Sequence, residues 1–262
     1  MLITLLKTTV NMANMKISIL TVVFNNVINI EQCIKSVLGQ TYKNLEYIVI
    51  DGKSSDGTLD VIKKYEHGIS KWISEPDQGI YDAINKGIGM ATGDVVGILH
   101  SDDFYASDKV IEKMAEAFAR YDVQSVYGDL VYVNKDGSRL IRYWRAGEYK
   151  EGMLRWGWMP PHPTFFVKRE VYEKYGRFNT NLKIAADYEM VLRLLARQKI
   201  TTCYIPEVLI KMRTGGISNG SIKGLVRKTV EDYRALRING LNLAILTLLS
   251  KNLSKIPQFF TR

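Results

Sequence analysis

The sequence predicts an α/β fold with a largely parallel central sheet flanked by helices, and three observations support this prediction. Apolar runs rich in β-branched residues alternate with segments of helical periodicity through the first 150 residues. These runs have no alternating polar face, as expected for strands covered by helices on both sides. The chain has 262 residues, 46% of them hydrophobic, which is enough to form a full core.

The first strands and helices are identified by their residue patterns. The run Ile17–Val23 suits a buried strand, and Asn29 is predicted to cap the helix that follows it. A second strand is predicted at 45–50, directly before a carboxylate. Helical spacing predicts a helix at 58–65, and a short third strand is expected at 72–73.

The middle of the chain contains the clearest helix. Apolar residues recur at helical spacing over 80–91. The apolar run at 94–100 predicts another strand, and Ser107 is expected to cap the next helix. Strands at 125–133 and 140–143 flank a Lys-Asp-Gly turn, which predicts a hairpin.

The pattern is less regular after residue 150. Helices are predicted at 168–175, 186–197 and 222–239, and a rigid proline-rich loop is predicted at 159–163. We expect three parts: an N-terminal extension at 1–15, one large domain at 16–220, and a basic, amphipathic helical region at 221–262. Because Met15 directly precedes the first strand, we expect translation to start there and residues 1–14 to be an upstream extension.

The balance of charge favours an anionic partner. Lysine and arginine number 36 against 27 aspartates and glutamates, for a net charge of +9. This charge suits nucleic acid, an anionic membrane surface or a phosphorylated small molecule. No segment has the length and hydropathy of a membrane span or a signal peptide, and Cys33 and Cys203 lack metal-ligand spacing. We therefore expect a cytoplasmic protein with reduced thiols.

Polar side chains follow three predicted strands at their carboxyl ends. They belong to Phe24–Asn26, Asp51–Gly57 and Ser101–Asp103. Ligands of open α/β sheets bind at this edge. Asp102 and Asp103 repel each other there, which favours a bound cation, and a solvated acidic turn is the alternative.

Longer motifs narrow the function. The chain has no GxGxxG after its first strand and no GxxxxGK[ST], which disfavours a dinucleotide site and a P-loop. It carries, in this order, TVVFNN, DGKSSDGT, DQGIYDAINKGIGMATGD and LHSDD. This ordered set resembles the family 2 glycosyltransferases, especially bacterial enzymes that build capsule, O-antigen or colanic acid. The resemblance covers about residues 16–220 and implies the GT-A fold, a Rossmann-like α/β fold, followed here by a helical C-terminal extension.

The resemblance implies a metal site at the acidic pair. Asp103 would hold Mn²⁺ or Mg²⁺, and Asp102 would contact the ribose of a nucleotide. Both metals prefer hard carboxylate oxygens. The family motif is often Asp-x-Asp, whereas this chain has His100 in the first place. His100 is therefore either a further metal ligand or a residue that merely ends the strand.

The resemblance also implies a base pocket. Asp51 matches a carboxylate that accepts a hydrogen bond from uracil, and Thr21, Phe24 and Asn25 would line the pocket. The alternative for Asp51 is a turn cap within DGKSSDG.

Two further motifs match the parts of the family that meet the sugar and the diphosphate. Asp82 and Lys86 lie in a region that approaches the ribose and diphosphate, or else they simply belong to a helix start. Arg213 begins an Arg-x-Gly-Gly-Ile-Ser loop and would clamp the diphosphate, with a plain turn as the alternative. His162, in PPHPTFF, would face the sugar.

Asp187 matches the carboxylate that takes the proton from the acceptor hydroxyl in the inverting mechanism of the family. The acid that commonly precedes this carboxylate is replaced by Ala186, so Asp187 stands alone. The alternative is a first-turn acid that the helix dipole favours.

The sequence thus predicts a metal-dependent inverting glycosyltransferase that moves a sugar from a nucleotide-diphosphate donor, a UDP-sugar, to a hydroxyl of a saccharide or lipid-linked saccharide. A nucleotidyltransferase is one alternative, although TVVFNN is not a glycine-rich, basic phosphate loop. A basic nucleic-acid-binding module is another, but acids rather than bases gather at the strand ends, so we expect no nucleic acid partner. The C-terminal region would contact an anionic membrane at its inner face, or a second copy of the chain.

Overall fold

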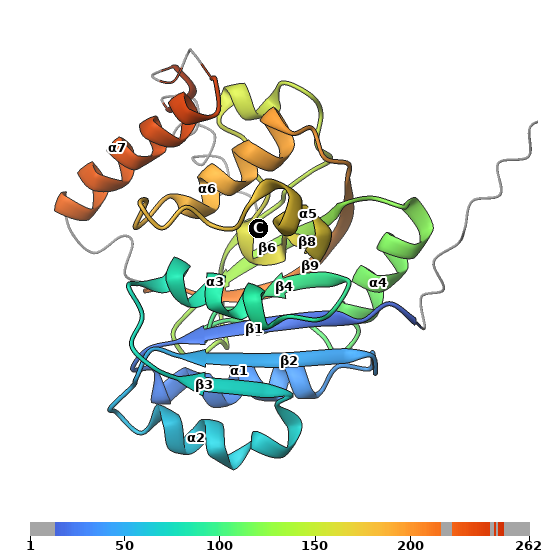
Figure 1. The fold of residues 1–262 in the computed structure, drawn as a ribbon, viewed down its shortest axis with the longest axis vertical. Coiled ribbons are helices and arrows are strands. Elements are labelled where there is room, and N and C mark those ends of the chain that lie inside the picture. Colours follow the sequence, from blue (N-terminus) through green and yellow to red (C-terminus); the bar gives the residue numbers. More distant parts are fainter. Residues whose placement is uncertain (1–13, 216–221, 242–243, 245, 249–262) are drawn as a thin grey trace, which may run out of the picture.

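The computed structural model describes residues 14–215, 222–241, 244 and 246–248. Nearly all of the predicted N-terminal extension, including residues 1–13, lies outside the described part. The same holds for 216–221 after Arg213, and for 242–243, 245 and 249–262 in the predicted C-terminal region. Within the described part, a mixed sheet of nine strands is covered by helices (Figure 1), which confirms the predicted α/β class.

The first half of the sheet is parallel. β1 (Ile17–Val23) lies between β2 (Leu45–Asp51) and β4 (Val95–Ile98), and β3 (Lys71–Ser74) pairs with β2. All three pairs run in the same direction. The carboxyl ends of these strands therefore meet at one edge of the sheet.

The second half of the sheet is mixed. The whole sheet has the order β3-β2-β1-β4-β8-β6-β9-β5, with β7 beside β6. β8 (Phe166–Lys168) runs antiparallel to both β4 and β6 (Ser125–Val133). β7 (Leu140–Trp144) forms the predicted hairpin with β6. β9 (Thr202–Arg213) is parallel to β6 and antiparallel to β5 (Phe104–Tyr105).

Helices cover both faces of the sheet. They are α1 (Val27–Leu38), α2 (Thr58–Lys64), α3 (Ile80–Met90), α4 (Val110–Tyr121), α5 (Arg169–Tyr175), α6 (Ala186–Val191) and α7 (Ile222–Ile238). Single 3₁₀ turns lie at Glu66–Gly68, Met153–Trp156 and His162–Thr164.

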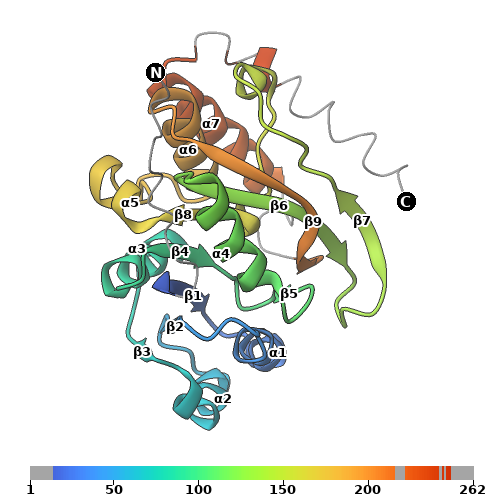
Figure 2. The ribbon, with the colours of Figure 1, turned by 90° about the vertical axis from the view of Figure 1, so that its right-hand side faces the viewer.

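Helices lie on both faces of the sheet (Figure 2), and the core consists mainly of two apolar layers, one on each face. Ile17 and Ile19 of β1 pack in the layer of α1 and α4, whereas Leu20 and Val22 pack in the layer of α3, α5 and α6. Successive side chains of a strand point to opposite faces. Burial on both sides explains why the sequence of β1 has no polar alternation.

Three helix predictions need correction. α4 begins at Val110 with Lys109 at its cap position, so Ser107 lies before the helix and does not cap it. α1 begins at Val27 with Asn26 at its cap position, so Asn29 lies inside the helix and does not cap it. The helix predicted over 186–197 is α-helical only to Val191 and continues as a π-helix over Leu192–Arg197.

The long strand β9 is absent from the sequence-based prediction. Pro206 and Glu207 interrupt its apolar pattern, and both are exposed. In the register with β6, Gly128 pairs with Ile205 and Asp129 pairs with Val208, so the two interrupting residues form a bulge. A strand that contains a bulge has no continuous period of two, which hides it from pattern reading.

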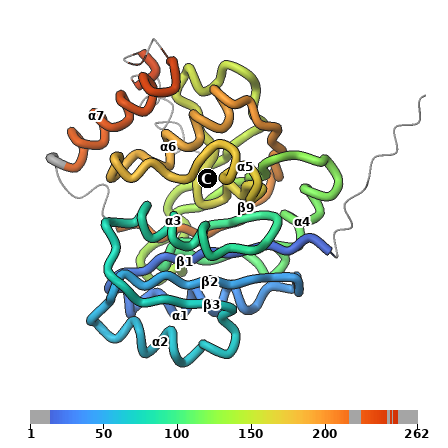
Figure 3. Tube along the Cα trace, in the orientation of Figure 1, coloured from blue at the N-terminus to red at the C-terminus, as the bar shows by residue number. Residues whose placement is uncertain are grey.

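Helix α7 packs beside α6 at the upper left of Figure 1, and the tube in Figure 3 shows the same arrangement. Ala235 and Leu236 anchor α7 in the layer that also holds α6. Among the described residues, no helix combines the length and hydropathy needed to cross a membrane.

Candidate active site

The carboxyl ends of β1, β2 and β4 are joined by hydrogen bonds between their loops. The Asn25 side chain accepts a bond of 2.8 Å from the Ser55 amide, and the Ser54 hydroxyl accepts one of 2.8 Å from the Asn25 amide. The Asn26 side chain donates to the hydroxyl of Ser101 at 2.9 Å. Three sequence segments far apart in the chain thus form one polar rim, as their positions after the strands predicted.

The backbone of the rim is in an uncommon conformation at two positions. Asn25 and Lys53 have φ angles of +48° and +64°, in the left-handed region that non-glycine residues rarely adopt. A Cβ on Gly52 would come within 2.5 Å of the Asp77 carboxylate and 3.3 Å of the Phe24 ring, so a larger residue here would displace the Asp77 side chain. Phe24 itself is 64% exposed at this rim. An exposed aromatic ring beside strained loops suits the face of a planar ligand.

Two residues expected to line a base pocket, Thr21 and Asp51, are buried beneath the polar rim. Thr21 has no exposed surface, and its hydroxyl lies 3.1 Å from that of Tyr47 and 3.6 Å from the Cys33 sulfur. Thr21 is on the α1 side of β1, so it supports the pocket and does not line it. Asp51 is also fully buried and accepts bonds from the Ser54 amide and the Ser74 hydroxyl. The amide of Ser54, in the loop that follows β2, bonds this carboxylate, which is the contact expected of the turn-cap alternative.

The acidic turn after β4 contains a buried carboxylate with an unsatisfied oxygen. Asp103 has no exposed surface, its Oδ1 accepts a bond from the Arg213 amide at 3.3 Å, and its Oδ2 has no partner among the residues that the structure describes. Burial and the charge of Asp102 raise the pKa of Asp103 well above its usual range. An isolated buried carboxylate is costly unless a cation or a proton neutralises it.

The residues of this turn fit a divalent metal only in part. Within the described residues, no three His, Cys, Asp or Glu side chains are grouped so as to hold an ion. The unpartnered oxygen of Asp103 and the half-exposed Asp102 offer hard oxygen donors, and Mg²⁺-type sites commonly use one or two carboxylates together with substrate phosphates. The donor set therefore fits a metal that is shared with a diphosphate.

His100 lies on the same turn and also has an unsatisfied atom, Nδ1. Burial, followed by the charge of nearby His162, lowers the pKa of His100 to about 4. The imidazole is therefore neutral near pH 7, which is the form that can bind a metal.

Arg213 holds the acidic turn in place, whereas the sequence suggested a clamp on diphosphate. It is 6% exposed. Its guanidinium donates to the backbone oxygens of Asp102 at 2.5 Å and Lys135 at 2.9 Å, and to the Gln32 side chain. The group also lies 4.9 Å from the centre of the Phe104 ring. Its donors are thus engaged by the protein, because β9 delivers Arg213 directly beneath the turn.

Lys86 and Asp82 are likewise occupied by protein partners. Lys86 lies 2.8 Å from Glu75 and 3.7 Å from Asp82, and it donates to the backbone oxygen of Pro76. Asp82 accepts a bond from the Gln78 amide at the start of α3. These contacts favour the helix-start interpretation for both residues.

Asp187 lies in the first turn of α6, and two side chains from other elements meet its carboxylate. Nδ1 of His162 lies 3.2 Å from Oδ2, and the hydroxyl of Tyr81 lies 3.2 Å from Oδ1. Burial and the charge of Asp187 raise the pKa of Tyr81, so its hydroxyl remains a proton donor at ordinary pH. The Asp187 side chain is 19% exposed and therefore accessible to a substrate.

The acidic turn and Asp187 belong to one site. The rings of His100 and His162 meet edge to face with their centres 5.6 Å apart. His100 belongs to the acidic turn and His162 contacts Asp187, so the two histidines bridge the two groups of acids.

Comparison with known families decides the class of protein. The family model described as glycosyl transferase family 2 matches residues 18–176, more than half of the chain. The chain belongs to glycosyl transferase family 2. This glycosyltransferase is 32% identical over 186 residues to an uncharacterized glycosyltransferase of Mycobacterium tuberculosis, and the match covers 68% of each chain. It is 31% identical over 167 residues to chondroitin synthase of Pasteurella multocida, which covers 63% of the glycosyltransferase and 17% of the synthase.

Solved structures share the fold of the glycosyltransferase. S. aureus TarS 1–349 in complex with UDP has a TM-score of 0.65 at 16% identity, over 90% of the glycosyltransferase and 68% of TarS. The mannosyltransferase PcManGT from Pyrobaculum calidifontis, in complex with GDP-Man and Mn²⁺, has a TM-score of 0.63 at 17% identity, over 93% and 75%. These likenesses confirm the predicted GT-A fold. With the family established, the nucleotidyltransferase and nucleic-acid-binding interpretations are set aside.

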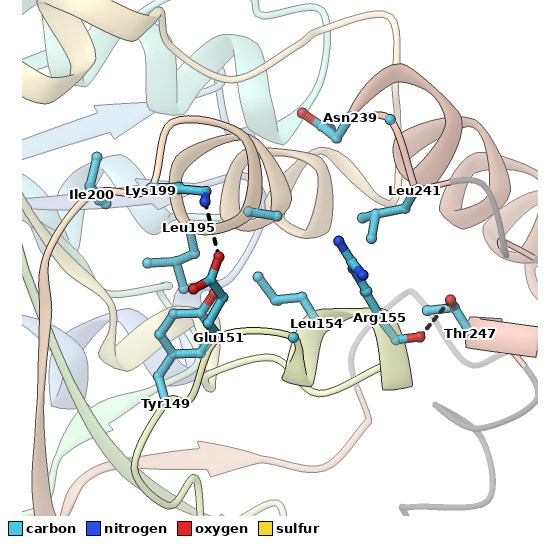
Figure 4. A pocket seen from close by; sticks show the side chains of 13 residues that line it. Tyr149, Glu151, Leu154, Arg155, Leu195, Lys199, Ile200, Asn239, Leu241 and Thr247 are labelled. Carbon is cyan, nitrogen blue, oxygen red and sulfur yellow. Dashed lines mark hydrogen bonds and ion pairs between the residues drawn. The ribbon is translucent and has the colours of Figure 1, made fainter.

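A cavity of about 720 Å³ lies apart from this site (Figure 4). It is bounded by Leu195–Ile200, by the segment around Arg155 and by the C-terminal end of α7 near Asn239. Glu151 and Lys199 form an ion pair of 2.9 Å across one side of it. Asp187 begins α6, whereas the cavity lies beyond the other end of the same helical segment, so the cavity is separate from the glycosyltransferase site.

Sequence reasoning overlooked Tyr81 of the glycosyltransferase. Tyr81 stood in the quoted motif DQGIYDAINKGIGMATGD, but the sequence predicted no role for it. Tyr81 and Asp187 are 106 positions apart in the chain, and no local sequence pattern indicates that their side chains are in contact.

Proposed function

We propose that the enzyme moves a sugar from a UDP-sugar to a hydroxyl of a saccharide or lipid-linked saccharide, with inversion at the anomeric carbon, in the synthesis of a bacterial surface polysaccharide. One observation carries the proposal: an acidic turn suited to a metal diphosphate and a carboxylate suited to a base are linked through the His100–His162 contact. The UDP named for TarS and the polysaccharide synthase among the relatives support the donor and acceptor classes.

In the proposed reaction, Asp187 accepts the proton of the acceptor hydroxyl as that oxygen attacks the anomeric carbon. The bond between them forms while the bond from the carbon to the diphosphate oxygen breaks, and nucleotide diphosphate leaves. A positioned general base contributes about 10²–10⁴-fold to rate. Tyr81 and His162, one at each oxygen, fix the orientation of this carboxylate.

We propose Mn²⁺ or Mg²⁺ as the cofactor, held by Asp103 together with Asp102, with His100 as a further donor. When bound, the ion supplies positive charge that stabilises the leaving diphosphate. Asp102 would also contact the ribose. Phe24 and Asn25 are proposed to contact the base, while Asp51 holds the loop after β2 through the Ser54 amide and Thr21 packs beneath the rim against Cys33.

Residues 16–220 are proposed to form the catalytic domain and 221–262 a region that meets the membrane. Val226, Val230 and Tyr233 of α7 are exposed at helical spacing beside the exposed Arg234 and Arg237. The two acids of α7, Glu231 and Asp232, are buried. An apolar stripe flanked by cations suits an anionic lipid surface, where a lipid-linked acceptor resides.

A binding screen tests the donor and the metal. Thermal unfolding is followed with UDP, UDP-glucose, UDP-GlcNAc and GDP-mannose, each with and without Mn²⁺. UDP and at least one UDP-sugar should raise the melting temperature only when Mn²⁺ is present. Stabilisation by UDP without metal would contradict the metal proposal, and a preference for GDP-mannose would contradict the donor proposal.

Asp187→Asn tests the base. Transfer should fall by about 10³-fold while the Kd for UDP with Mn²⁺ changes less than twofold, since the base acts on the acceptor. Asp60→Asn, an exposed first-turn acid of α2, is the matched control. Transfer that survives in Asp187→Asn would assign the base elsewhere.

Sedimentation with vesicles tests the membrane surface. The enzyme should sediment with vesicles containing phosphatidylglycerol and not with pure phosphatidylcholine, and Arg234→Glu/Arg237→Glu should abolish this binding. A dimer in solution that the same substitutions disrupt would instead identify α7 as a contact between two copies.

A further inference from the structure

Glu231 is a buried carboxylate of α7 that reaches the start of the helix carrying Asp187. It is 4% exposed. Its Oε2 accepts hydrogen bonds from the amides of Ile184 at 2.7 Å and Ala185 at 3.1 Å, 47 and 46 residues earlier in the chain. Its Oε1 accepts a bond of 3.0 Å from Arg227 on its own helix.

Helix α6 needs this acceptor because its own sequence does not provide one. The cap position is Ala185, whose side chain cannot accept a hydrogen bond. The first amides of a helix require partners from outside the helix. The amide of a cap residue is usually paired with a Glu or Gln side chain at the third helical position, which is Tyr188 here, and Glu231 supplies that acceptor from α7.

The peptide unit between Ile184 and Ala185 is held from both sides. Glu231 accepts from the amide of Ala185, and the hydroxyl of Tyr81 donates to the carbonyl oxygen of Ile184 at 2.8 Å. The same hydroxyl lies 3.2 Å from Asp187. α3 and α7 therefore fix, from opposite edges, the backbone from which Asp187 projects two residues later.

The ionised form of Glu231 suits this role. Burial alone would raise the pKa of its carboxyl, but the bonds from the Ile184 amide and from Arg227 outweigh burial and lower it. Glu231 thus remains a charged acceptor at ordinary pH, and charge-assisted hydrogen bonds are the stronger kind.

We propose that Glu231 is a positioning residue that couples helix α7 to the proposed base Asp187. This inference rests on the proposed function, because it assigns Glu231 a part in placing that base. A displacement of about 1 Å at a reacting group can cost about 10²-fold in rate.

Three variants at this position test the coupling. Glu231→Ala removes the acceptor, Glu231→Asp retracts it by one methylene, and Glu231→Gln keeps an oxygen in reach of both amides. The assay measures kcat for release of UDP from the UDP-sugar in the presence of an acceptor. We expect kcat to fall about 10- to 100-fold in Glu231→Ala and Glu231→Asp, and to lie within about threefold of the wild-type value in Glu231→Gln. The Kd for UDP with Mn²⁺ should change less than twofold in all three.

Arg227→Ala is the matched control. It removes the ion-pair partner of Glu231 but leaves both amide bonds, so kcat should remain near that of the wild type. Hydrogen exchange of the peptide spanning 180–190 gives a readout independent of activity. The Ile184 and Ala185 amides should lose protection in Glu231→Asp and Glu231→Ala and keep it in Glu231→Gln and Arg227→Ala.

Two outcomes would overturn the inference. One is unchanged kcat in Glu231→Asp despite lost amide protection. The other is an equal loss of kcat in Arg227→Ala and Glu231→Asp. Asp187→Asn in the same assay separates the two proposals: if it retains transfer, the base assignment fails, whereas if it abolishes transfer and Glu231→Asp does not reduce it, only the coupling fails.

Discussion

Two buried carboxylates lie near opposite ends of the strands of the same sheet, and they differ in how many hydrogen-bond donors surround them. Glu46, near the start of β2, is 3% exposed and accepts hydrogen bonds from Ser18, the amide and hydroxyl of Thr92, Lys71 and Lys16. Asp103, after the end of β4, is fully buried, accepts one bond, and leaves one oxygen unpaired.

The pKa values follow this difference. Burial raises the pKa of both groups, but the bonds from Ser18, Thr92 and Lys71 lower the pKa of Glu46 to about 2. Burial and the neighbouring Asp102 raise the pKa of Asp103 well above 3.8. The negative charge of Glu46 is compensated by donors within the fold, so Glu46 contributes to stability. The carboxyl of Asp103 has no such compensation among the described residues and would be stabilised by a bound cation. A buried acid without partners is thus a better indicator of a functional site than a buried acid as such.

Asp103→Asn should have the largest effect, on function. We expect Mn²⁺-dependent UDP binding to be lost and transfer to fall by about 10³-fold, since a bound metal contributes several kcal/mol to stabilising developing charge. Calorimetry with UDP and Mn²⁺ and an assay of UDP release measure the two losses. Asp108→Asn, an exposed acid five residues later, should change neither. If UDP binding by Asp103→Asn still depended on Mn²⁺, the proposal that Asp103 holds the metal would be contradicted.

Glu46→Ala should have the next largest effect, on folding. It leaves the Ser18 hydroxyl and the Thr92 amide without their acceptor, and we expect a loss of about 3–5 kcal/mol in the free energy of unfolding. Urea denaturation measures this loss, with the exposed Glu66→Ala as control. The stabilisation by Glu46 should be present above pH 4.5 and disappear as the pH falls toward about 2, because the folded pKa is the lower one. A loss below 1 kcal/mol would contradict the structural role.

Asp103→Asn should also stabilise the metal-free fold, by a few degrees in melting temperature. With its raised pKa, Asp103 holds its proton in the folded state after the unfolded chain has released it, so wild-type stability falls as the pH rises above 3.8. Asparagine removes this fall. Melting curves in EDTA from pH 4 to 8 should therefore diverge with rising pH, and added Mn²⁺ with UDP should stabilise only the wild type. Parallel curves would show that Asp103 is not strained by its burial.

Lys16→Ala should have the smallest effect. The Lys16 side chain is 40% exposed and lies 3.4 Å from Glu46, so solvent screens the pair, and we expect a loss below about 1 kcal/mol. The ratio of this loss to that of Glu46→Ala, measured in the same urea titration, shows how much of the stabilisation comes from the buried donors. A larger loss in Lys16→Ala would show that most of the stabilisation by Glu46 comes from the exposed Lys16.

Most of the fold and the outline of the site could be predicted from the sequence. β1 and β6 have their predicted bounds, and β2 and α3 differ from theirs by one residue at one end. Local periodicity determines such elements, because a helix or a buried strand imposes its own spacing on apolar residues. The rim of Asn25, Asp51 and Asp103 follows from the rule that parallel strands end at one edge.

The errors share a physical cause. β9 was hidden by the bulge at Pro206 and Glu207, and Arg213 at its end was expected to bind diphosphate. Thr21 was expected in the pocket, although the pleat points it to the other face of β1. In each case the partner comes from a distant segment, which is β6 for β9, Gln32 for Arg213 and Tyr47 for Thr21, and the sequence contains no local trace of that partner.

The sequence by itself determined the α/β class, the order of the elements and the acids that follow the strands, because these depend on short-range periodicity and on strand direction. Only the tertiary structure decided which carboxylates have hydrogen-bond donors for both of their oxygens. The difference between Glu46 and Asp103, the two histidines that join the acidic turn to Asp187, and the bonds from Glu231 to the start of α6 all depend on contacts between residues far apart in the chain. The protonation and orientation of a carboxylate are set by the few groups within hydrogen-bonding distance, and folding alone brings those groups together.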